Sequence, residues 1–330
     1  MKKYRPAKKG FAIWMARLLF ALVLIGAAIL HAYGMLETAL DGRRARSAGE
    51  KEPSYFQLRE QMFAGQADTR VSGWLSLAAS EEIEIKAERG KLAATHYFPV
   101  KRLEDAPWAL VLHGGLGTDR SQVLDIACML SLSGYHVLTP DLYAHGQSEG
   151  SISSLGICEA QDVESWVGWI LAQDADAEIV LYGQDEGGVA CLLAGKALSH
   201  TVRAVAVDSA YNSVGGRMMQ LAEEARGRLS GAEGALLSAA FRLAHGVTTE
   251  AGEIEERVRD YPLPLLLIHG TGDEDVPAWH SEDIALAAGE KAELYFAEGA
   301  GHGMARYLEA QEYSEVLLGF FAEAVGSEYE

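Results

Sequence analysis

The most constraining feature of the sequence is a turn from an apolar strand into a helix, which reads Ile179-Val-Leu-Tyr-Gly183-Gln-Asp185-Glu-Gly187-Gly188. A sharp turn of this kind strains its central residue and crowds the neighbours, which explains the glycines on both sides of Asp185. It also pushes the side chain of Asp185 out at the carboxyl edge of a sheet, beside the amino terminus of the next helix. A lone Gly-x-Asp-x-Gly is more often an ordinary turn, so its meaning depends on the segments around it.

From residue 82 onward, short apolar strands alternate with helical stretches, the pattern of a mostly parallel sheet covered by helices on both faces. We predict an opening hairpin over residues 82–88 and 92–98. Further strands are expected over residues 108–113, 136–142, 179–182, 204–208, 265–269 and 293–296. The predicted fold class is therefore α/β, with about eight strands.

Two polar segments follow predicted strands downstream of the turn. The first is His269-Gly-Thr-Gly-Asp273-Glu-Asp275-Val-Pro277, and the second is Gly299-Ala-Gly301-His302-Gly303. Their order is nucleophile, acid, histidine, and each member ends a strand, which can bring the three side chains together at one edge of the sheet. Upstream, Leu112-His113-Gly114-Gly115 follows another strand, and its backbone N–H groups could join the N–H of Glu186 in an oxyanion hole.

With these segments the chain resembles the α/β-hydrolase superfamily over about residues 80–325. Within it, the chain is similar to bacterial single-span hydrolases of the serine aminopeptidase-like and dipeptidyl-peptidase-like kind. The resemblance implies Asp185 as nucleophile, Asp273 as acid, His302 as general base, and Gly115 and Glu186 as oxyanion donors. It implies no metal and no organic cofactor. The other motifs that carry it are His113-Gly-Gly, Gly134-Tyr-His-Val-Leu-Thr-Pro-Asp141-Leu-Tyr-Ala-His145-Gly-Gln-Ser148-Glu-Gly150 and Asp208-Ser-Ala-Tyr211-Asn-Ser213.

Two positions depart from the superfamily pattern. Asp185 replaces the usual serine, and Tyr143 replaces the arginine common in the Asp-x-Arg-x-His-Gly loop. An aspartate nucleophile resembles the haloalkane dehalogenases and epoxide hydrolases, in which the carboxylate forms an alkyl ester that histidine-activated water then cleaves. In dehalogenases an aromatic residue follows the nucleophile, whereas Glu186 stands here. The scissile bond could therefore be an ester, an epoxide or a carbon–halogen bond.

The stretch from residue 212 to 260 interrupts the alternation with helical sequence, and we predict a helical cap inserted after the sixth strand. Its apolar residues suggest a small or medium apolar ligand; they are Met218, Met219, Leu221 and Phe241. Epoxide hydrolases use cap tyrosines to assist the leaving oxygen. Tyr211 and Tyr261 flank the predicted cap and are the candidate substrate-binding residues.

Other interpretations compete with an Asp185/Asp273/His302 triad. The chain could be a catalytically inactive binding module, in which His302 is a satisfied buried histidine and Asp273 its structural partner. A negative Glu186 side chain beside the oxyanion hole would oppose anionic intermediates unless it points to solvent. Five residues are expected to have structural or surface roles instead: His145, Ser148, Ser209, His269 and Asp275.

The amino-terminal segment is apolar from residue 11 to 33, apart from Arg17 and His31, which is enough to cross a bilayer as a helix. We predict a basic cytoplasmic tip (residues 1–10), a transmembrane anchor (11–36), a connector (37–70) and a hydrolase domain (71–330). Five basic residues precede the apolar run and three follow it, which favours a cytoplasmic amino terminus and an extracytoplasmic body at the cell membrane. Signal cleavage is the alternative, although small residues fall inside the run rather than after it.

The charge distribution bears on possible partners. The formal net charge is −19, and the chain beyond residue 46 carries 19 basic against 45 acidic residues. Such an acidic body would be repelled by nucleic acid, so we expect only a small-molecule substrate or ligand and, at the amino terminus, the lipid bilayer. The three cysteines lack metal-type spacing and are expected to be buried thiols.

Overall fold

The structure is a computed structural model that describes residues 8–42, 67–101 and 105–326 of the 330-residue chain. The basic side chains at residues 2, 3 and 5 and most of the predicted connector lie outside these ranges. Cys128, Cys158 and Cys191 are buried free thiols, as their apolar context predicts.

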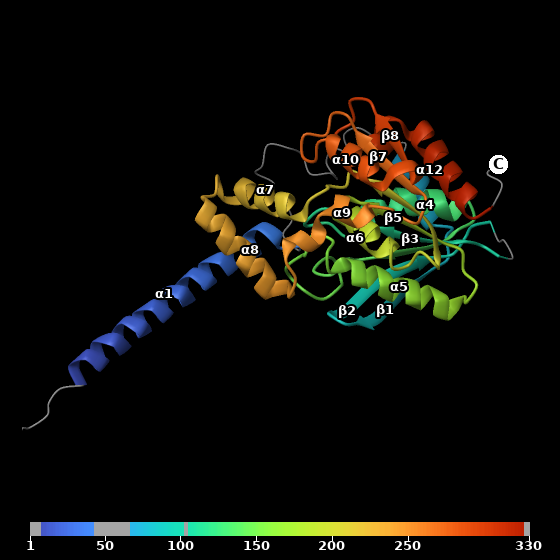
Figure 1. Ribbon diagram of the computed structural model, residues 1–330. Coiled ribbons are helices and arrows are strands. Elements are labelled where there is room, and N and C mark those ends of the chain that lie inside the picture. Colours follow the sequence, from blue (N-terminus) through green and yellow to red (C-terminus); the bar gives the residue numbers. More distant parts are fainter. Residues whose placement is uncertain (1–7, 43–66, 102–104, 327–330) are drawn as a thin grey trace, which may run out of the picture.

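Eight strands form a single sheet in the order β1-β2-β4-β3-β5-β6-β7-β8 (Figure 1). The antiparallel hairpin of β1 (Ser80–Ala87) and β2 (Gly90–Tyr97) lies at one edge, and β2 is also antiparallel to β4. All other neighbours run parallel. These strands are β3 (Trp108–Leu112), β4 (His136–Pro140), β5 (Ile179–Gln184), β6 (Val202–Asp208), β7 (Leu265–Gly270) and β8 (Ala292–Ala297). The predicted sheet is therefore confirmed, with its mostly parallel order and opening hairpin.

Helices cover both faces of the sheet, because inner strands that are apolar at every position, such as β3, need a layer on each side. Along β3, Leu110 and Leu112 join one hydrophobic cluster while Ala109 and Val111 join the other. The first cluster contains α5 (Glu159–Gln173), α6 (Asp185–Gly195), α9 (Ile254–Val258) and α10 (Trp279–Ala288). The second contains α3 (Ala67–Leu75), α4 (Leu124–Leu132), α11 (Ala305–Leu308) and α12 (Ala310–Ala324). Three short 3-10 helices connect elements; they are η1 (Arg120–Val123), η2 (Thr249–Gly252) and η3 (Gly289–Lys291).

A helical insertion separates β6 from β7 and consists of α7 (Val214–Arg226), α8 (Gly231–His245) and α9, within the range expected for a cap. Ser213 caps α7, and Ser230 with Glu233 forms a capping box on α8, so the sequence fixes both starts. The apolar residues that suggested a ligand pocket have another role. Met218, Leu221 and Phe241 are buried in the first hydrophobic cluster, so they hold the insertion in place.

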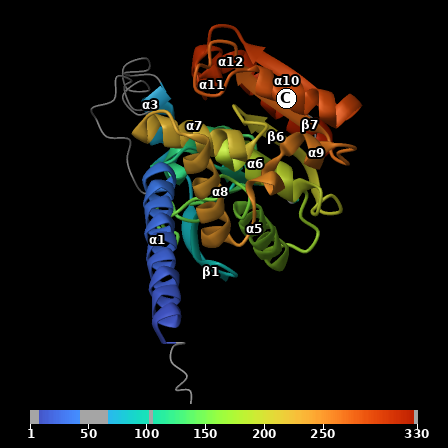
Figure 2. The ribbon, with the colours of Figure 1, turned by 60° about the vertical axis from the view of Figure 1, so that its left-hand side comes forward.

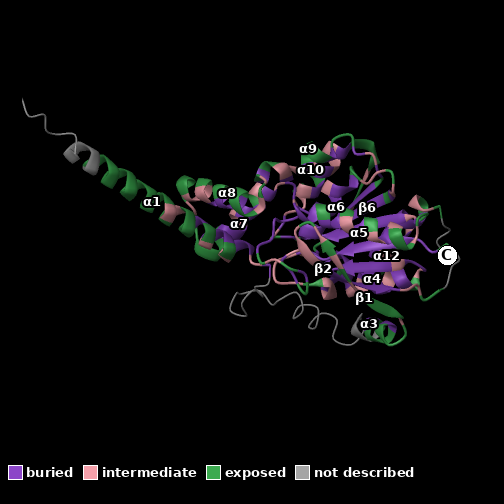
Figure 3. Ribbon diagram, turned by 90° about the horizontal axis from the view of Figure 1, so that it is seen from below, coloured by how far each residue is buried: buried purple, intermediate pink, exposed green. Residues whose placement is uncertain are grey.

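Helix α1 (Lys8–Leu40) projects from the body beside α7 and α8 (Figures 1 and 2). The segment Ile13–Leu40 is long and apolar enough to span a membrane. Its outer part is mostly exposed (Figure 3), and large apolar side chains such as Leu19 and Phe20 face outward there. Its last turns differ, because Met35, Leu36 and Leu40 are buried in the same hydrophobic cluster as α7 and α8. The helix thus continues beyond residue 36, the predicted end of the anchor, because these apolar residues pack on the insertion.

Candidate active site

Asp185 lies at the junction of β5 and α6, in the strained turn that the sequence predicts. Its φ of 47° is in the left-handed region, which non-glycine residues adopt only when the surroundings enforce it. The turn is tight because α6 starts directly against β5: a side-chain carbon on Gly183 would lie 2.3 Å from the carbonyl oxygen of Gly187. The Asp185 side chain is almost fully buried, with 5% of its surface exposed.

The three predicted triad residues come together at the carboxyl edge of the sheet. His302 Nδ1 lies 2.8 Å from Asp273 Oδ2, and His302 Nε2 lies 3.7 Å from Asp185 Oδ2. Asp273 is held by the turn after β7, where its other oxygen accepts hydrogen bonds from the N–H groups of Asp275 and Val276. The imidazole of His302 therefore lies between two carboxylates, with 23% of its surface exposed.

This arrangement sets the charges of the site. Burial alone would lower the pKa of His302, but the carboxylates of Asp185 and Asp273 outweigh it and raise that pKa to about 10. Burial would likewise raise the pKa of Asp273, but hydrogen bonds from His269, His302 and the N–H of Val276 lower it to about 2. At neutral pH His302 is thus an imidazolium.

His269 is a further buried side chain in contact with the carboxylate of Asp273. Its Nε2 lies 2.7 Å from the carbonyl oxygen of Val276 and 3.3 Å from Asp273 Oδ2, and its Nδ1 lies 2.7 Å from Ser281 Oγ. This buried histidine therefore does more than the packing that its place at a strand end suggests, because it also contacts the carboxylate of Asp273.

The candidate oxyanion donors lie on both sides of Asp185. Gly115 faces the carboxylate, since a side-chain carbon added there would lie 3.6 Å from Asp185 Oδ2. Glu186 is the second residue of α6, so its N–H has no partner within the helix. Thr118 holds the Gly115 loop by donating its hydroxyl to the carbonyl oxygens of Gly114 and Gly115.

The side chain of Glu186 does not point to solvent. It is 1% exposed and accepts a hydrogen bond from Ser153 Oγ at 2.9 Å. Burial, and next the charge of Glu159, raises the pKa of Glu186 well above its ordinary value. Burial thus favours the neutral form of Glu186, which lessens the negative charge beside the candidate oxyanion donors.

The two candidate substrate-binding tyrosines are buried, and their hydroxyls already donate to backbone carbonyls. Tyr211 bonds Leu155 at 2.9 Å, and Tyr261 bonds Leu192 at 3.2 Å. Tyr211 lies close enough to Asp185 for that carboxylate, after burial itself, to raise its pKa. Tyr261 instead packs against Gly195 at the far end of α6, which is roughly 15 Å along the helix from Asp185. The structure does not bring Tyr261 to the site.

Sequence reasoning missed Arg217 of α7. Its guanidinium makes two hydrogen bonds to the carboxylate of Asp275, at 2.7 and 2.9 Å, and only 4% of its side chain is exposed. Burial lowers the pKa of Arg217, but this bonding and then the charge of Asp185 raise it. Asp275 is thus neither a helix cap nor a free surface residue. Asp275 holds the positively charged guanidinium of Arg217, a residue of the insertion, near Asp185.

Arg306 of α11 is a second residue that motif reading missed. It is buried and donates to Gln184 Oε1 at 2.8 Å and to the carbonyl oxygen of Gln122. Gln184 directly precedes Asp185, so the hydrogen bond from Arg306 connects the segment after His302 to the turn that contains Asp185. Its position after the histidine motif was visible in the sequence, but no spacing rule connects it to Gln184.

The hydroxyls of Ser148 and Ser209, near the turn that contains Asp185, already have hydrogen-bond partners. Ser148 Oγ donates to the carbonyl of Asp141, and Ser209 Oγ donates to Asp208 while accepting from the N–H of Gly303. His145 is fully buried, and its Nδ1 lies 3.0 Å from the carbonyl oxygen of Tyr143. These residues have the structural roles that their positions suggested.

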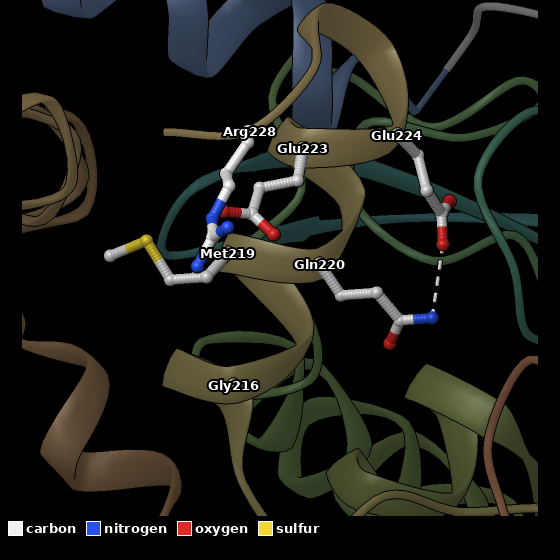
Figure 4. Close-up of a pocket in the computed structure, with 6 residues that line it drawn as sticks. All are labelled: Gly216, Met219, Gln220, Glu223, Glu224 and Arg228. Atoms are coloured by element: carbon white, nitrogen blue, oxygen red, sulfur yellow. Dashed lines mark hydrogen bonds between the residues drawn. The ribbon is translucent and has the colours of Figure 1, made fainter. Parts of the chain in front are cut away.

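A surface hollow of about 640 Å³ lies along α7, outside the triad (Figure 4). Most of its lining residues are polar or charged, and Gln220 Nε2 donates to Glu224 Oε1 at 3.0 Å. The lining residues are Gly216, Met219, Gln220, Glu223, Glu224 and Arg228. Within the described ranges, no group of three or more histidine, cysteine or acidic side chains is arranged to hold a metal ion.

Comparison with known proteins agrees with this architecture. The sequence matches the model of the alpha/beta hydrolase family over residues 109–316, which is more than half of the chain. The chain belongs to the alpha/beta hydrolase family. The matched range runs from β3 into α12 and contains all three candidate triad residues.

This α/β-hydrolase has uncharacterized relatives. It is 27% identical over 249 residues to protein Rv2307c of Mycobacterium tuberculosis, covering 75% of this chain and 81% of that protein. It is 25% identical over 230 residues to protein YfhR of Escherichia coli, covering 68% and 74%.

Solved structures share the fold of this α/β-hydrolase. The Pyrococcus furiosus esterase Pf2001 aligns with a TM-score of 0.57 at 20% identity, over 74% of this chain and 91% of the esterase. Est1E of Butyrivibrio proteoclasticus, solved with ferulic acid bound, aligns with a TM-score of 0.58 at 22% identity, over 74% and 100%. Identities this low establish the fold alone.

Proposed function

We propose that this chain is a membrane-anchored hydrolase in which Asp185 is the nucleophile, His302 the base and Asp273 the orienting acid. The observation that carries the proposal is the position of His302, 2.8 Å from Asp273 and 3.7 Å from Asp185. The longer distance is within reach of one small side-chain movement, and catalytic contacts are often long before substrate binds. The partial exposure of His302 leaves a route to it from solvent.

The charges support an alkyl-transfer reaction in two steps. In the first, a carboxylate oxygen of Asp185 attacks an electrophilic carbon and displaces a halide or an alkoxide, leaving an alkyl ester. The ester has no charge, so His302 loses one of the two carboxylates that raise its pKa and can release its proton to solvent or to the alkoxide. The first step thus converts His302 from an imidazolium into a base.

In the second step, neutral His302 takes a proton from water, and the resulting hydroxide attacks the carboxyl carbon of the ester. In this proposal the N–H groups of Gly115 and Glu186 stabilise the tetrahedral oxyanion, a role supported by the closeness of Gly115 to Asp185 and by the place of Glu186 in the first turn of α6. Collapse releases the alcohol and restores the Asp185 carboxylate, which again favours the proton on His302. The net reaction consumes one water: a haloalkane yields an alcohol and the hydrogen halide, and an epoxide, whose alkoxide stays attached, yields a diol.

The test uses the full chain in detergent, because the end of α1 is part of the hydrophobic core. A single turnover in heavy-oxygen water, on panels of epoxides, haloalkanes and esters, should put the heavy oxygen into Asp185, since water attacks its carboxyl carbon. Peptide mass spectrometry locates it. His302→Ala should instead accumulate the ester on Asp185. Turnover with heavy oxygen only in the product would refute Asp185 as nucleophile.

The second candidate is a binding module without activity. It is favoured by the tyrosines, whose hydroxyls are both committed to backbone carbonyls and offer no acid to a leaving group. Asp185→Ser separates the two cases. If the natural chain is inert towards every panel and the serine variant hydrolyses simple esters, the scaffold is an intact hydrolase whose natural form binds rather than reacts.

We further propose that α1 is retained as the membrane anchor, with the body outside the cytoplasm. Removal of the segment up to residue 36 would strip Ala32, Met35 and Leu36 from the core, so the packing supports retention over cleavage. The small-molecule substrate and the bilayer are then its expected partners.

A further inference from the structure

The end of α1 lies against the loops that form the candidate active site. The N–H of Gly42 donates to the carbonyl oxygen of Ser151, and the carbonyl oxygen of Gly42 accepts from the N–H of Gly117, both at 3.1 Å. Two residues earlier, the carbonyl oxygen of Leu40 accepts from the N–H of Ser153 at 2.9 Å. The chain leaves the helix by joining these two loops rather than by entering solvent.

Two of these contacts connect residues 40–42 to the candidate oxyanion donors, Gly115 and Glu186. Gly117 belongs to the loop of residues 113–118, which also carries Gly115. Ser153, on the other side, donates its hydroxyl to the side chain of Glu186 at 2.9 Å. The two donors thus depend on a common support outside the hydrolase motifs.

Side-chain packing fixes the same junction. Gly42 is buried, and a side-chain carbon there would lie 2.7 Å from the carbonyl oxygen of Ala144 and 3.0 Å from the ring of His145. The His145 ring in turn meets the His113 ring edge-on, with 5.2 Å between their centres. His113 begins the Gly115 loop, so the position of the loop depends on the chain approaching this closely at Gly42.

We propose that residues 40–42 are positioning residues of the active site: they hold the Gly115 loop and the Ser153–Glu186 contact in place for catalysis. The anchor helix then has a role in the chemistry in addition to its attachment to the membrane. This inference rests on the oxyanion role proposed for Gly115 and Glu186. The junction itself can be tested without any substrate.

The test compares Gly42→Ala with Gly34→Ala in the full chain. Gly34 lies within α1 with open space around it, whereas the added methyl at Gly42, just after the helix, meets the backbone of Ala144. Amide hydrogen exchange over residues 113–118 and 150–154 should be about fivefold to tenfold faster in Gly42→Ala, the effect of losing one or two hydrogen bonds. Exchange in β5 and β6 should not change. Equal exchange in both variants, or uniform acceleration across the sheet, overturns the proposal.

A second readout reports on the oxyanion donors directly. In an Asp185→Ser background, a fluorophosphonate probe should label the serine, and adding Gly42→Ala should slow labelling about tenfold to hundredfold while Gly34→Ala does not. Equal labelling rates in the two double variants overturn the proposal. An Asp185→Ser chain that never reacts counts against the oxyanion role proposed for Gly115 and Glu186, and hydrogen exchange then decides the inference about residues 40–42 on its own.

Discussion

Replacing Asp185 by asparagine should lower the pKa of His302. The imidazolium is stabilised by two carboxylates, one on each ring nitrogen, and the substitution removes the charge of one while keeping its size. Asp273 remains in place and keeps the ring oriented. The change therefore isolates the electrostatic effect of Asp185 on the catalytic base.

The size of the effect follows from the 3.7 Å between His302 Nε2 and Asp185 Oδ2. Two unit charges at that separation attract by about 4 kcal/mol at an effective dielectric constant of ~20, which is equivalent to ~3 pKa units. The ring is 23% exposed, so solvent screening reduces this figure. We expect a fall of roughly 1 to 3 units from the value of about 10.

The assay is an NMR titration of histidine ring signals in the isotope-labelled full chain in detergent, with His302→Ala to assign the resonance. Glu274→Gln is the matched control, because it removes one negative charge from the exposed residue beside Asp273. A His302 that titrates near 6.5 in the natural chain, or one whose pKa is the same in Asp185→Asn, would refute the charge coupling on which the two-step reaction depends.

Two further predictions concern stability. Because folding raises the pKa of His302 from 6.5 to about 10, its imidazolium contributes stability in full below pH 6.5, and the contribution is lost as the pH rises through 10. Thermal denaturation of the natural chain and of His302→Gln should therefore converge with rising pH, by up to ~1.4 kcal/mol per pH unit, and a constant difference would contradict this. Asp275→Asn leaves the buried Arg217 without its charge partner and should cost about 3 kcal/mol in denaturant unfolding. Glu178→Gln, at the exposed pair with Arg203, should cost less than ~1 kcal/mol, and equal losses would be evidence against the buried pairing.

The parts of the fold that were predictable from the sequence are those governed by local rules. Strand-length apolar runs predicted the sheet, and glycines around Asp185 predicted the turn that the φ of 47° now describes. The meeting of Asp273 and His302 followed from their places at strand ends, since parallel strands bring those ends to one edge.

The parts that were not predictable depend on contacts between distant segments. Arg217 looks like an ordinary charged residue of an amphipathic helix, and only the docking of α7 onto the turn after β7 gives it a partner. The direction of the Glu186 side chain depended on Ser153, which stands 33 residues away in the sequence. The apolar residues at the end of α1 match those of a transmembrane span, so composition alone does not separate the part in the core from the part outside it.

The unbroken course of α1 has a consequence for how the protein would search for its substrate. If the bilayer surface lay at Leu30, the ten residues from there to Leu40 would extend about 15 Å along α1 between the surface and the body. Because the last turn of α1 is buried in the hydrophobic core, the body cannot rotate freely relative to this helix. The carboxyl edge of the sheet, where the candidate active site lies, would therefore stay within a thin layer parallel to the bilayer. Encounters with substrate would then depend on lateral diffusion in two dimensions rather than on tumbling in the bulk solution.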